Sequence, residues 1–244
     1  MRVIEKPSPN LDERQGVAVA DILLLHYTGM RTCEEAVARL TSAEAKVSSH
    51  YTIDEDGTTY RHVAEQMRAW HAGVSSWRGA SDVNSRSIGI EIVNPGHEFG
   101  YREFPNAQIE AVIRLSKAIV GRNPIPPRNV IAHSDVAPGR KADPGELFPW
   151  QRLAEAGLGM WTEAKAGRDA PLLRGMTGGR VAALQTSLAH YGYGIDANAE
   201  FDERTEIVVS AFQRHFRSVN FDGVADAETQ ARLRVLNEML DRIA

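Results

Sequence analysis

Three short apolar runs limit what this chain can fold into more than any other feature of its 244 residues. They are DILLLHYT (21–28), SIGIEIVN (87–94) and NVIAH (129–133). Each is rich in aliphatic residues and of strand length, so each predicts a strand. Residues 105–121, between the second and third runs, place apolar side chains on one face of a helix. Strands that interleave with helices indicate an α/β domain, with a central sheet covered by helices.

Two local signals add elements to this domain. Thr32 is followed three residues later by Glu35, which is the spacing of a capping box, and this pair predicts a helix start. The segment SHYTIDEDGTTYRHV (49–63) predicts a β-hairpin, because Asp56 and Gly57 form a favoured two-residue turn.

The sequence changes character after the α/β pattern. TEAKAGRDAP (162–171) is polar and poor in large apolar residues, which predicts a linker. The predicted organisation is a first domain over 1–160, a linker over 161–171 and a second domain over 172–244. The second domain is expected to be a small three-helix all-α unit, in which Asp202 and Asp226 each stand where a helix N-cap is expected.

The composition excludes several classes of protein. With 43% hydrophobic and 25% charged residues, the chain resembles an ordinary soluble globular protein. A net charge of −4 without a basic stripe argues against nucleic-acid binding. No run approaches the roughly 18 apolar residues of a membrane helix, and the lone Cys33 allows no internal disulfide.

The beginning of the sequence bears on the compartment. MRVIEKPSPNLDERQG lacks the apolar core of a secretory leader, so the chain as written is expected in the cytoplasm. If a leader was removed, the periplasm or cell envelope is the alternative. The chain is expected to be a monomer.

Two histidines and one aspartate form a candidate metal site. His26 and His133 each end an apolar strand, and Asp143 follows His133 across a loop stiffened by proline and glycine. Two imidazoles and a carboxylate leave one position of a four-coordinate zinc ion open for water. The alternative is that both histidines are strand-end residues bonded to the backbone.

Two further residues could supply chemistry beside such a metal. Glu91 interrupts the apolar strand IGIEIV and points to the face opposite Ile90 and Ile92. In a cleft it would be a general base, whereas on an open face it would meet only solvent. Lys141 could stabilise an oxyanion, and its alternative is a solvated loop.

A third group predicts substrate contacts. His50, Trp70 and His71 combine rings with polar tips, which suits sugar or peptide binding in a groove. Arg140, beside Lys141, is included as a substrate-binding candidate. For each of these residues, local packing or a solvated loop is the alternative. The remaining histidines form no pattern and are expected to be structural or exposed: His62, His97, His190 and His215.

Five motifs occur in a specific order: LLLHYTG, SSHYTIDEDGTTYRHV, AWHAG, SIGIEIVN and AHSDVAPGRKADPG. Over residues 15–155 they resemble the zinc-dependent N-acetylmuramoyl-L-alanine amidases of the peptidoglycan-recognition-protein fold, the type 2 amidases. Residues 172–243 resemble the small three-helix peptidoglycan-binding module that is often attached to cell-wall hydrolases.

The resemblance implies a mixed sheet with surrounding helices, a groove holding one zinc ion, and cleavage of the amide between N-acetylmuramic acid and L-alanine. By position it implies that His26, His133 and Asp143 are the zinc ligands, Glu91 the catalytic glutamate and Lys141 the catalytic lysine. Asp143 stands where some relatives have cysteine. Ser49 stands where some have a tyrosine, so Glu91 is left as the base.

Several readings stay open. A non-catalytic peptidoglycan receptor and a zinc peptidase acting within the stem peptide are alternatives to the amidase, and the substrate is either intact peptidoglycan or a 1,6-anhydro-muropeptide. The second domain is expected to anchor substrate, with docking onto the catalytic domain as its alternative.

Overall fold

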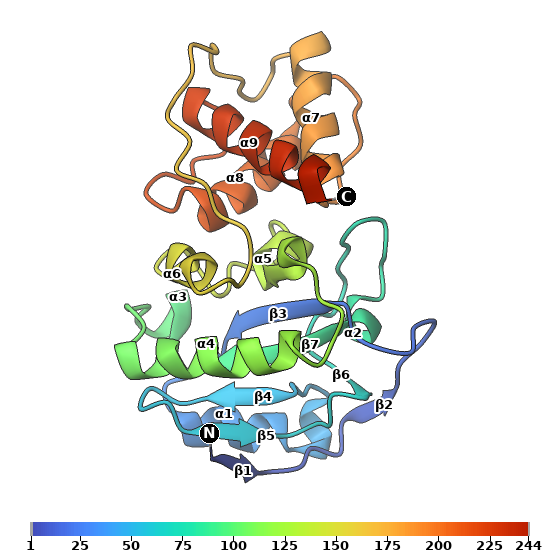
Figure 1. The fold of residues 1–244 in the computed structure, drawn as a ribbon, viewed down its shortest axis with the longest axis vertical. Helices are drawn as coiled ribbons and strands as arrows, with labels where there is room; N and C mark the ends of the chain where they lie inside the picture. Colours follow the sequence, from blue (N-terminus) through green and yellow to red (C-terminus); the bar gives the residue numbers. More distant parts are fainter. Residues whose placement is uncertain (1, 244) are drawn as a thin grey trace.

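The computed structural model describes residues 2–243. Its centre is a six-stranded mixed sheet (Figure 1). The strand order is β1 (Val3–Glu5), β5 (Thr59–Arg61), β4 (Tyr51–Ile53), β7 (Ser87–Ile92), β3 (Ile22–Tyr27) and β8 (Val130–Ala132). Only the β4–β5 pair is antiparallel. A separate antiparallel pair joins β2 (Leu11–Glu13) to β6 (Met67–Ala69). The α/β prediction is therefore confirmed.

The central strands are apolar because both faces of the sheet are covered. Leu23 and Leu25 of β3 pack in the same cluster as Val112 of helix α4 (Asn106–Val120). Ile22 and Leu24, on the opposite face of β3, pack in the cluster that extends into the C-terminal helices. His26 continues the alternation of Ile22 and Leu24, so its imidazole lies on that second face.

The capping box and the hairpin turn that the sequence predicts are both present in the structure. Helix α1 (Cys33–Leu40) begins after Thr32, whose hydroxyl accepts a hydrogen bond from the Glu35 backbone N–H at 3.2 Å. The β4–β5 hairpin turns at Gly57, whose φ of 86° is easily adopted by glycine. The shorter elements are the helices α2 (Val83–Arg86), α3 (Gly96–Phe99), α5 (His133–Val136) and α6 (Trp150–Glu155), and the 3₁₀ turns η1 (Ala43–Ala45) and η2 (Pro127–Asn129).

One sequence expectation needs correction. The sequence predicts that His133 ends a strand and precedes a loop, but β8 ends at Ala132 and His133 begins the short helix α5. The Asp135 carboxylate accepts a hydrogen bond from the Ala132 backbone N–H at 2.8 Å. This bond satisfies a backbone donor at the helix start, and so a polar segment without helical periodicity forms one helical turn.

The C-terminal part contains the three expected helices, α7 (Gly179–Tyr191), α8 (Glu203–Phe216) and α9 (Ala227–Ile243). Asp202 and Asp226 both accept hydrogen bonds from backbone N–H groups three residues on, as N-caps do. Residues 161–171 form no helix or strand, in keeping with the predicted linker. None of the helices within residues 2–243 is long and apolar enough to cross a membrane.

The helical part packs directly onto the α/β part at α5 (Figure 1). Asp135 accepts hydrogen bonds from the Tyr193 hydroxyl and the His215 Nδ1 atom, both at 2.6 Å. The Trp150 ring stacks on His215 with 3.8 Å between ring centroids, and Trp77 meets Tyr193 edge to face. One apolar cluster runs through both parts, so the helical unit is docked rather than loosely tethered.

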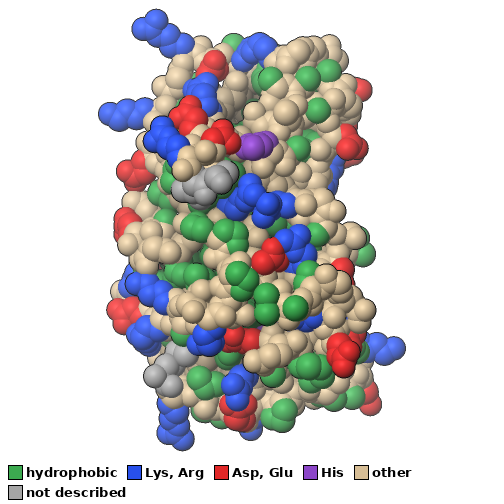
Figure 2. Space-filling view, turned by 45° about the vertical axis from the view of Figure 1, so that its right-hand side comes forward, with side chains coloured by type: hydrophobic (Ala, Val, Ile, Leu, Met, Phe, Trp, Pro, Cys, Tyr) green, Lys and Arg blue, Asp and Glu red, His purple; other side chains and the backbone are tan. Residues whose placement is uncertain are grey.

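The surface carries both signs of charge. On the face drawn in Figure 2, side chains of Lys and Arg are interspersed with those of Asp and Glu, and neither sign forms a continuous stripe. This distribution agrees with the small net charge of −4.

Candidate metal centre and catalytic cavity

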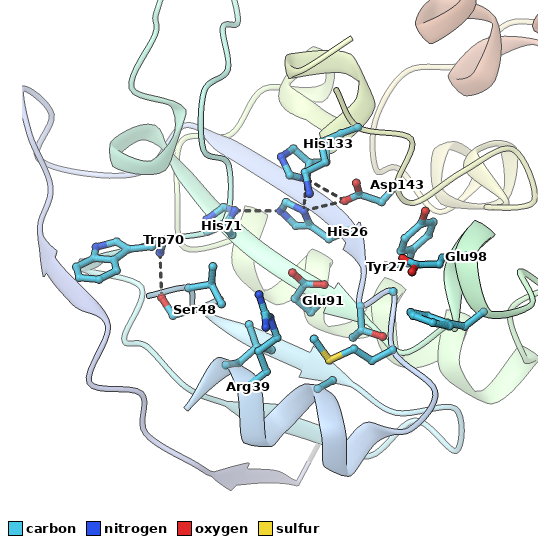
Figure 3. A pocket seen from close by; sticks show the side chains of 18 residues that line it. His26, Tyr27, Arg39, Ser48, Trp70, His71, Glu91, Glu98, His133 and Asp143 are labelled. Carbon is cyan, nitrogen blue, oxygen red and sulfur yellow. Dashed lines mark hydrogen bonds and ion pairs between the residues drawn. The ribbon is translucent and has the colours of Figure 1, made fainter. Parts of the chain in front are cut away.

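Three donor atoms converge at the carboxyl end of β3 (Figure 3). The Nδ1 atoms of His26 and His133 lie 2.9 Å apart, and the Asp143 Oδ2 atom lies 3.0 Å from the first and 2.9 Å from the second. The three residues are 1%, 3% and 5% exposed. Asp143 returns to this place because the Ser134 backbone N–H bonds its carbonyl oxygen at 3.0 Å.

The protonation of these groups tests whether a metal fits. His133 Nε2 lies 3.0 Å from the Ala72 carbonyl oxygen, which can only accept, so Nε2 carries the proton and Nδ1 offers a lone pair. The Asp143 Oδ2 atom lies 2.9 Å from this Nδ1 atom and 3.0 Å from the Nδ1 atom of His26. The lone pair of His133 Nδ1 therefore faces the Asp143 carboxyl oxygen at 2.9 Å inside the protein. A cation between the two atoms would satisfy both of them. The donor set fits a divalent metal ion.

The electrostatics of His26 agree with this reading. Burial, followed by the nearby His133, lowers the pKa of His26 to about 4. The imidazole is thus neutral near pH 7, which is the form that binds metals.

The metal site opens into a cavity of about 590 Å³. Glu91 of β7 lines this cavity and lies opposite His26 in the parallel β3–β7 register. Its Oε2 atom is buried and has no hydrogen-bond partner among the described residues. Burial, with Asp143 as the next cause, raises the pKa of Glu91 well above its usual range. A carboxyl group with a raised pKa can both take up and release a proton near neutral pH.

Lys141 and two of the predicted substrate-binding residues also line the cavity. Lys141 is exposed and stands two residues before Asp143. Trp70 lies on the far wall, where its backbone N–H bonds the Ser48 hydroxyl at 2.9 Å (Figure 3). His71 lies between Trp70 and the metal site, with its Nδ1 atom 3.0 Å from His26 Nε2. The structure thus brings these three residues and Glu91 to one cavity.

His50 does not reach the cavity, and its predicted contact with substrate is wrong for this structure. The residue is 0% exposed and its Nδ1 accepts a hydrogen bond from the Gly89 backbone N–H at 2.9 Å. Its Nε2 lies 3.1 Å from the Met67 carbonyl oxygen. Burial, followed by the neighbouring Arg14, lowers the pKa of His50 to about 3. His50 therefore ties β6 to β7.

Arg140 is likewise absent from the metal cavity. Its guanidinium group donates hydrogen bonds to the carbonyl oxygens of Ala72 and Val74 at 2.6 and 2.7 Å. Arg140 therefore holds the segment 72–74 against the loop that follows His133. It lines a second groove on the other side of the loop instead. Sequence motifs located Arg140 and His50 near the site, but not which way each side chain points.

Other cavity residues escaped the sequence analysis. Among them are Tyr27, Arg39, Glu98 and Phe99 (Figure 3 labels the first three). Arg39 stands in the last turn of α1, which is the first helix after the strand that carries His26. This closeness in the sequence could have indicated Arg39 as a cavity residue. Glu98 and Phe99 come from α3, a four-residue helix without a periodic pattern, so no signal was available.

Comparisons with known proteins agree with the geometry. A family model described as N-acetylmuramoyl-L-alanine amidase matches residues 16–146, and a peptidoglycan-binding-domain model matches residues 177–233. The N-acetylmuramoyl-L-alanine amidase AmiD of Escherichia coli (strain K12) is 41% identical over 97% of this chain and 90% of its own length. The 1,6-anhydro-N-acetylmuramyl-L-alanine amidase AmpD of that strain is 36% identical over 46% of this chain and 58% of its own length.

Solved structures show the same fold. AmiD from E. coli, in complex with anhydro-N-acetylmuramic acid-L-Ala-D-gamma-Glu-L-Lys, matches with a TM-score of 0.79 and 37% identity, covering 94% of this chain and 98% of that one. AmpDh3 from Pseudomonas aeruginosa, in complex with anhydromuramic pentapeptide, matches with a TM-score of 0.76 and 33% identity, covering 93% and 94%. The family model spans more than half of this chain, and the AmiD relative covers nearly all of it. The chain therefore belongs to the N-acetylmuramoyl-L-alanine amidase family.

Proposed function

We propose that the cavity hydrolyses the amide bond between N-acetylmuramic acid, or its 1,6-anhydro form, and L-alanine, with one zinc ion held by His26, His133 and Asp143. The observation that carries this proposal is the convergence of three donor atoms within 3.0 Å of one another beside Glu91. Three protein ligands with two imidazoles are typical of catalytic zinc sites, which keep a fourth position for water.

The chain's own residues define the rest of the reaction. Bound zinc would lower the pKa of a water molecule to about 7 and polarise the substrate carbonyl. Glu91 takes a proton from the attacking water and passes it to the departing L-alanine nitrogen, because its raised pKa suits both steps. The Lys141 ammonium group compensates the negative charge that develops on the carbonyl oxygen.

The substrate is proposed from the relatives. AmiD and AmpDh3 are both described in complex with anhydromuramic peptides. A cavity of about 590 Å³ lies in the usual range of small-molecule sites. We therefore propose a soluble anhydro-muropeptide as a substrate, and peptidoglycan turnover and recycling as the process.

The helical domain suggests a second, larger substrate. A groove of about 380 Å³ lies between the metal-binding loop and α8, and Lys141 lines both this groove and the metal cavity. Arg140 lines it from the loop, and Glu206 and Arg214 from α8, so charged side chains stand on both of its walls. We propose that polymeric peptidoglycan extends from the cavity along this groove, and that the helical domain anchors substrate there while docked.

Product analysis tests the reaction itself. The zinc-loaded protein is mixed with anhydro-N-acetylmuramic acid tripeptide and, separately, with intact sacculi, and products are identified by mass spectrometry. Free muramic sugar with an intact peptide is expected. A shortened peptide would indicate a peptidase, and no product with zinc bound would indicate a receptor.

The groove has its own variant. Ser210 of α8 lines the groove and not the metal cavity, and Ser210→Trp would fill the space. This variant is expected to retain activity on the soluble tripeptide and lose activity on sacculi. If the variant keeps its activity on both substrates, the groove does not bind the polymer, and docking onto the catalytic domain is the only role left for the helical domain.

Compartment and oligomeric state are proposals with direct tests. We propose a monomer in the cytoplasm, where soluble fragments are its substrate, with the periplasm or cell envelope as the alternative in which it would meet polymeric peptidoglycan. Cell fractionation, with an antibody against the native protein, tests the compartment. Recovery in the cytoplasmic fraction is expected, and recovery in the envelope fraction would contradict the cytoplasmic proposal. Light scattering during size-exclusion chromatography measures the mass of the assembly, for which about 26.9 kDa is expected.

A further inference from the structure

His71 contacts the metal ligand His26 on the side away from the metal. Its Nδ1 atom lies 3.0 Å from His26 Nε2, and the two rings meet edge to face at 88°. At the other end of its ring, His71 Nε2 lies 3.4 Å from the Ser87 hydroxyl oxygen. The order Ser87, His71, His26 thus forms a hydrogen-bonded chain that ends at the metal-binding face of His26.

The direction of the chain can be derived from its outer end. The Ser87 hydroxyl donates to the Val83 carbonyl oxygen at 2.7 Å, and so its oxygen is free to accept from His71 Nε2–H. A neutral imidazole carries one N–H, which leaves His71 Nδ1 as an acceptor. His26 Nε2 must then be the donor, and His26 Nδ1 carries the lone pair that faces Asp143 and His133.

The backbone beneath His71 is shaped to hold the ring. A Cβ atom added at Gly89 would lie 2.6 Å from both Cε1 and Nδ1 of His71, which is closer than real Cβ contacts allow. Gly89 and Glu91 lie two residues apart along β7, so both face the cavity side of the sheet. The glycine two residues before the glutamate in the IGIE motif is therefore required by the imidazole that rests on it.

We propose that His71 is a positioning residue that fixes His26 in the tautomer that binds metal, with Ser87 setting the direction of the hydrogen bonds and Gly89 providing the space. This inference rests on the metal site of the proposed function. The His71 ring also lines the cavity, so its predicted contact with substrate stays a prediction beside this role. Partners of this kind orient a metal ligand and raise its basicity.

Two substitutions of His71 distinguish the effect of its hydrogen-bond acceptor from the effect of its side-chain volume. In His71→Asn the side-chain oxygen can take the place of Nδ1 and accept from His26 Nε2–H. In His71→Leu the volume is largely kept and the acceptor is lost. We expect the zinc dissociation constant, measured by competition with a chromophoric chelator, to rise about 10- to 100-fold for His71→Leu and to stay near the wild-type value for His71→Asn.

Nitrogen-15 NMR of the metal-free protein reads the tautomer without any enzymatic assay. The wild type and His71→Asn are expected to show His26 protonated at Nε2, whereas His71→Leu shows a mixture of both tautomers. Gly89→Ala, which displaces the His71 ring without removing it, should weaken zinc binding as His71→Leu does. His62→Asn is the matched control, because His62 is a buried histidine that does not line the cavity.

The outcomes separate this inference from the proposed function. If His71→Leu keeps wild-type zinc affinity and an Nε2-protonated His26, the positioning role is wrong, whatever the protein hydrolyses. If zinc affinity falls in both His71 variants and in His62→Asn alike, the effect is structural, and the inference is also wrong. Failure of the amidase assay alone would leave the tautomer result standing.

Discussion

The metal cavity and the junction between the two domains lie side by side but differ in how their buried carboxyl groups are hydrogen-bonded. In the cavity, His26, His133 and Asp143 direct lone pairs at one another, and a Glu91 oxygen has no partner among the described residues. At the junction, two residues after His133, the Asp135 carboxylate accepts three hydrogen bonds.

The contrast follows from what each region does. Leaving a buried polar group unpaired costs roughly 1–3 kcal/mol, so folded proteins keep few of them. Where they cluster in a cavity, a ligand or a reaction is the usual reason. At the junction the Asp135 carboxylate is fully paired and stabilises the fold, and the atom without a partner among the described residues is His215 Nε2. The metal site is therefore distinguished by several lone pairs that converge on one point without a donor between them.

The largest effect expected from this comparison is the loss of a metal ligand. His26→Ala removes one of three donor atoms, so zinc binding and amidase activity should both disappear. The loss of rate should exceed the roughly 100- to 1,000-fold typical for removing one oxyanion contact. Metal analysis of the purified variant and product formation from the soluble tripeptide measure the two effects.

A weaker but still large effect is expected at Glu91. Glu91→Gln keeps the shape of the side chain but removes its ability to accept a proton, and should lower kcat about 100- to 10,000-fold while zinc stays bound. Rates and metal content are measured on the same sample. Near wild-type turnover of the zinc-loaded variant would show that another group is the base.

The junction should respond in stability instead of rate. His215→Phe keeps a ring stacked on Trp150 but leaves Asp135 with one partner fewer, and should cost about 2–4 kcal/mol of unfolding free energy. Urea unfolding measures this, and kcat of the folded, zinc-loaded variant should be unchanged. His190→Phe is the control, since the His190–Asp241 pair is exposed and should contribute less than about 1 kcal/mol. A fall in kcat with unchanged stability would make the junction part of the catalytic site.

The sequence predicted well what depends on neighbours along the chain. Asp202 and Asp226 cap helices through backbone groups three residues away, and the period-2 pattern of β7 correctly separated Glu91 from Ile90. The three donors were identified because strands end at a common edge and because the ordered motifs resemble a known family.

What the sequence could not give depends on contacts across the fold. His50 and His71 are both histidines in characteristic motifs, but only tertiary packing decides that one bonds the Gly89 backbone and the other bonds His26. Asp135 looked like one more polar residue in a loop. Its partners Tyr193 and His215 lie 58 and 80 residues away, and no local pattern encodes such pairing.

The smallest effect returns to Glu91 and concerns stability. Because burial raises the pKa of this carboxyl group in the folded protein, ionising it destabilises the fold. The folded state gains from the protonated form below the unfolded pKa, and this contribution is lost as pH rises through the raised folded pKa. Glu91→Gln, which cannot ionise, should therefore have nearly the wild-type Tm at pH 4 and a higher Tm at pH 8, by roughly 2–4 °C for each kcal/mol gained. The comparison is made on metal-free protein in a chelator, because a bound cation would favour the carboxylate and reduce the difference. A variant less stable than wild type at pH 8 would mean that the Glu91 carboxylate is satisfied in solution, and the contrast between cavity and junction would then rest on the metal ligands alone.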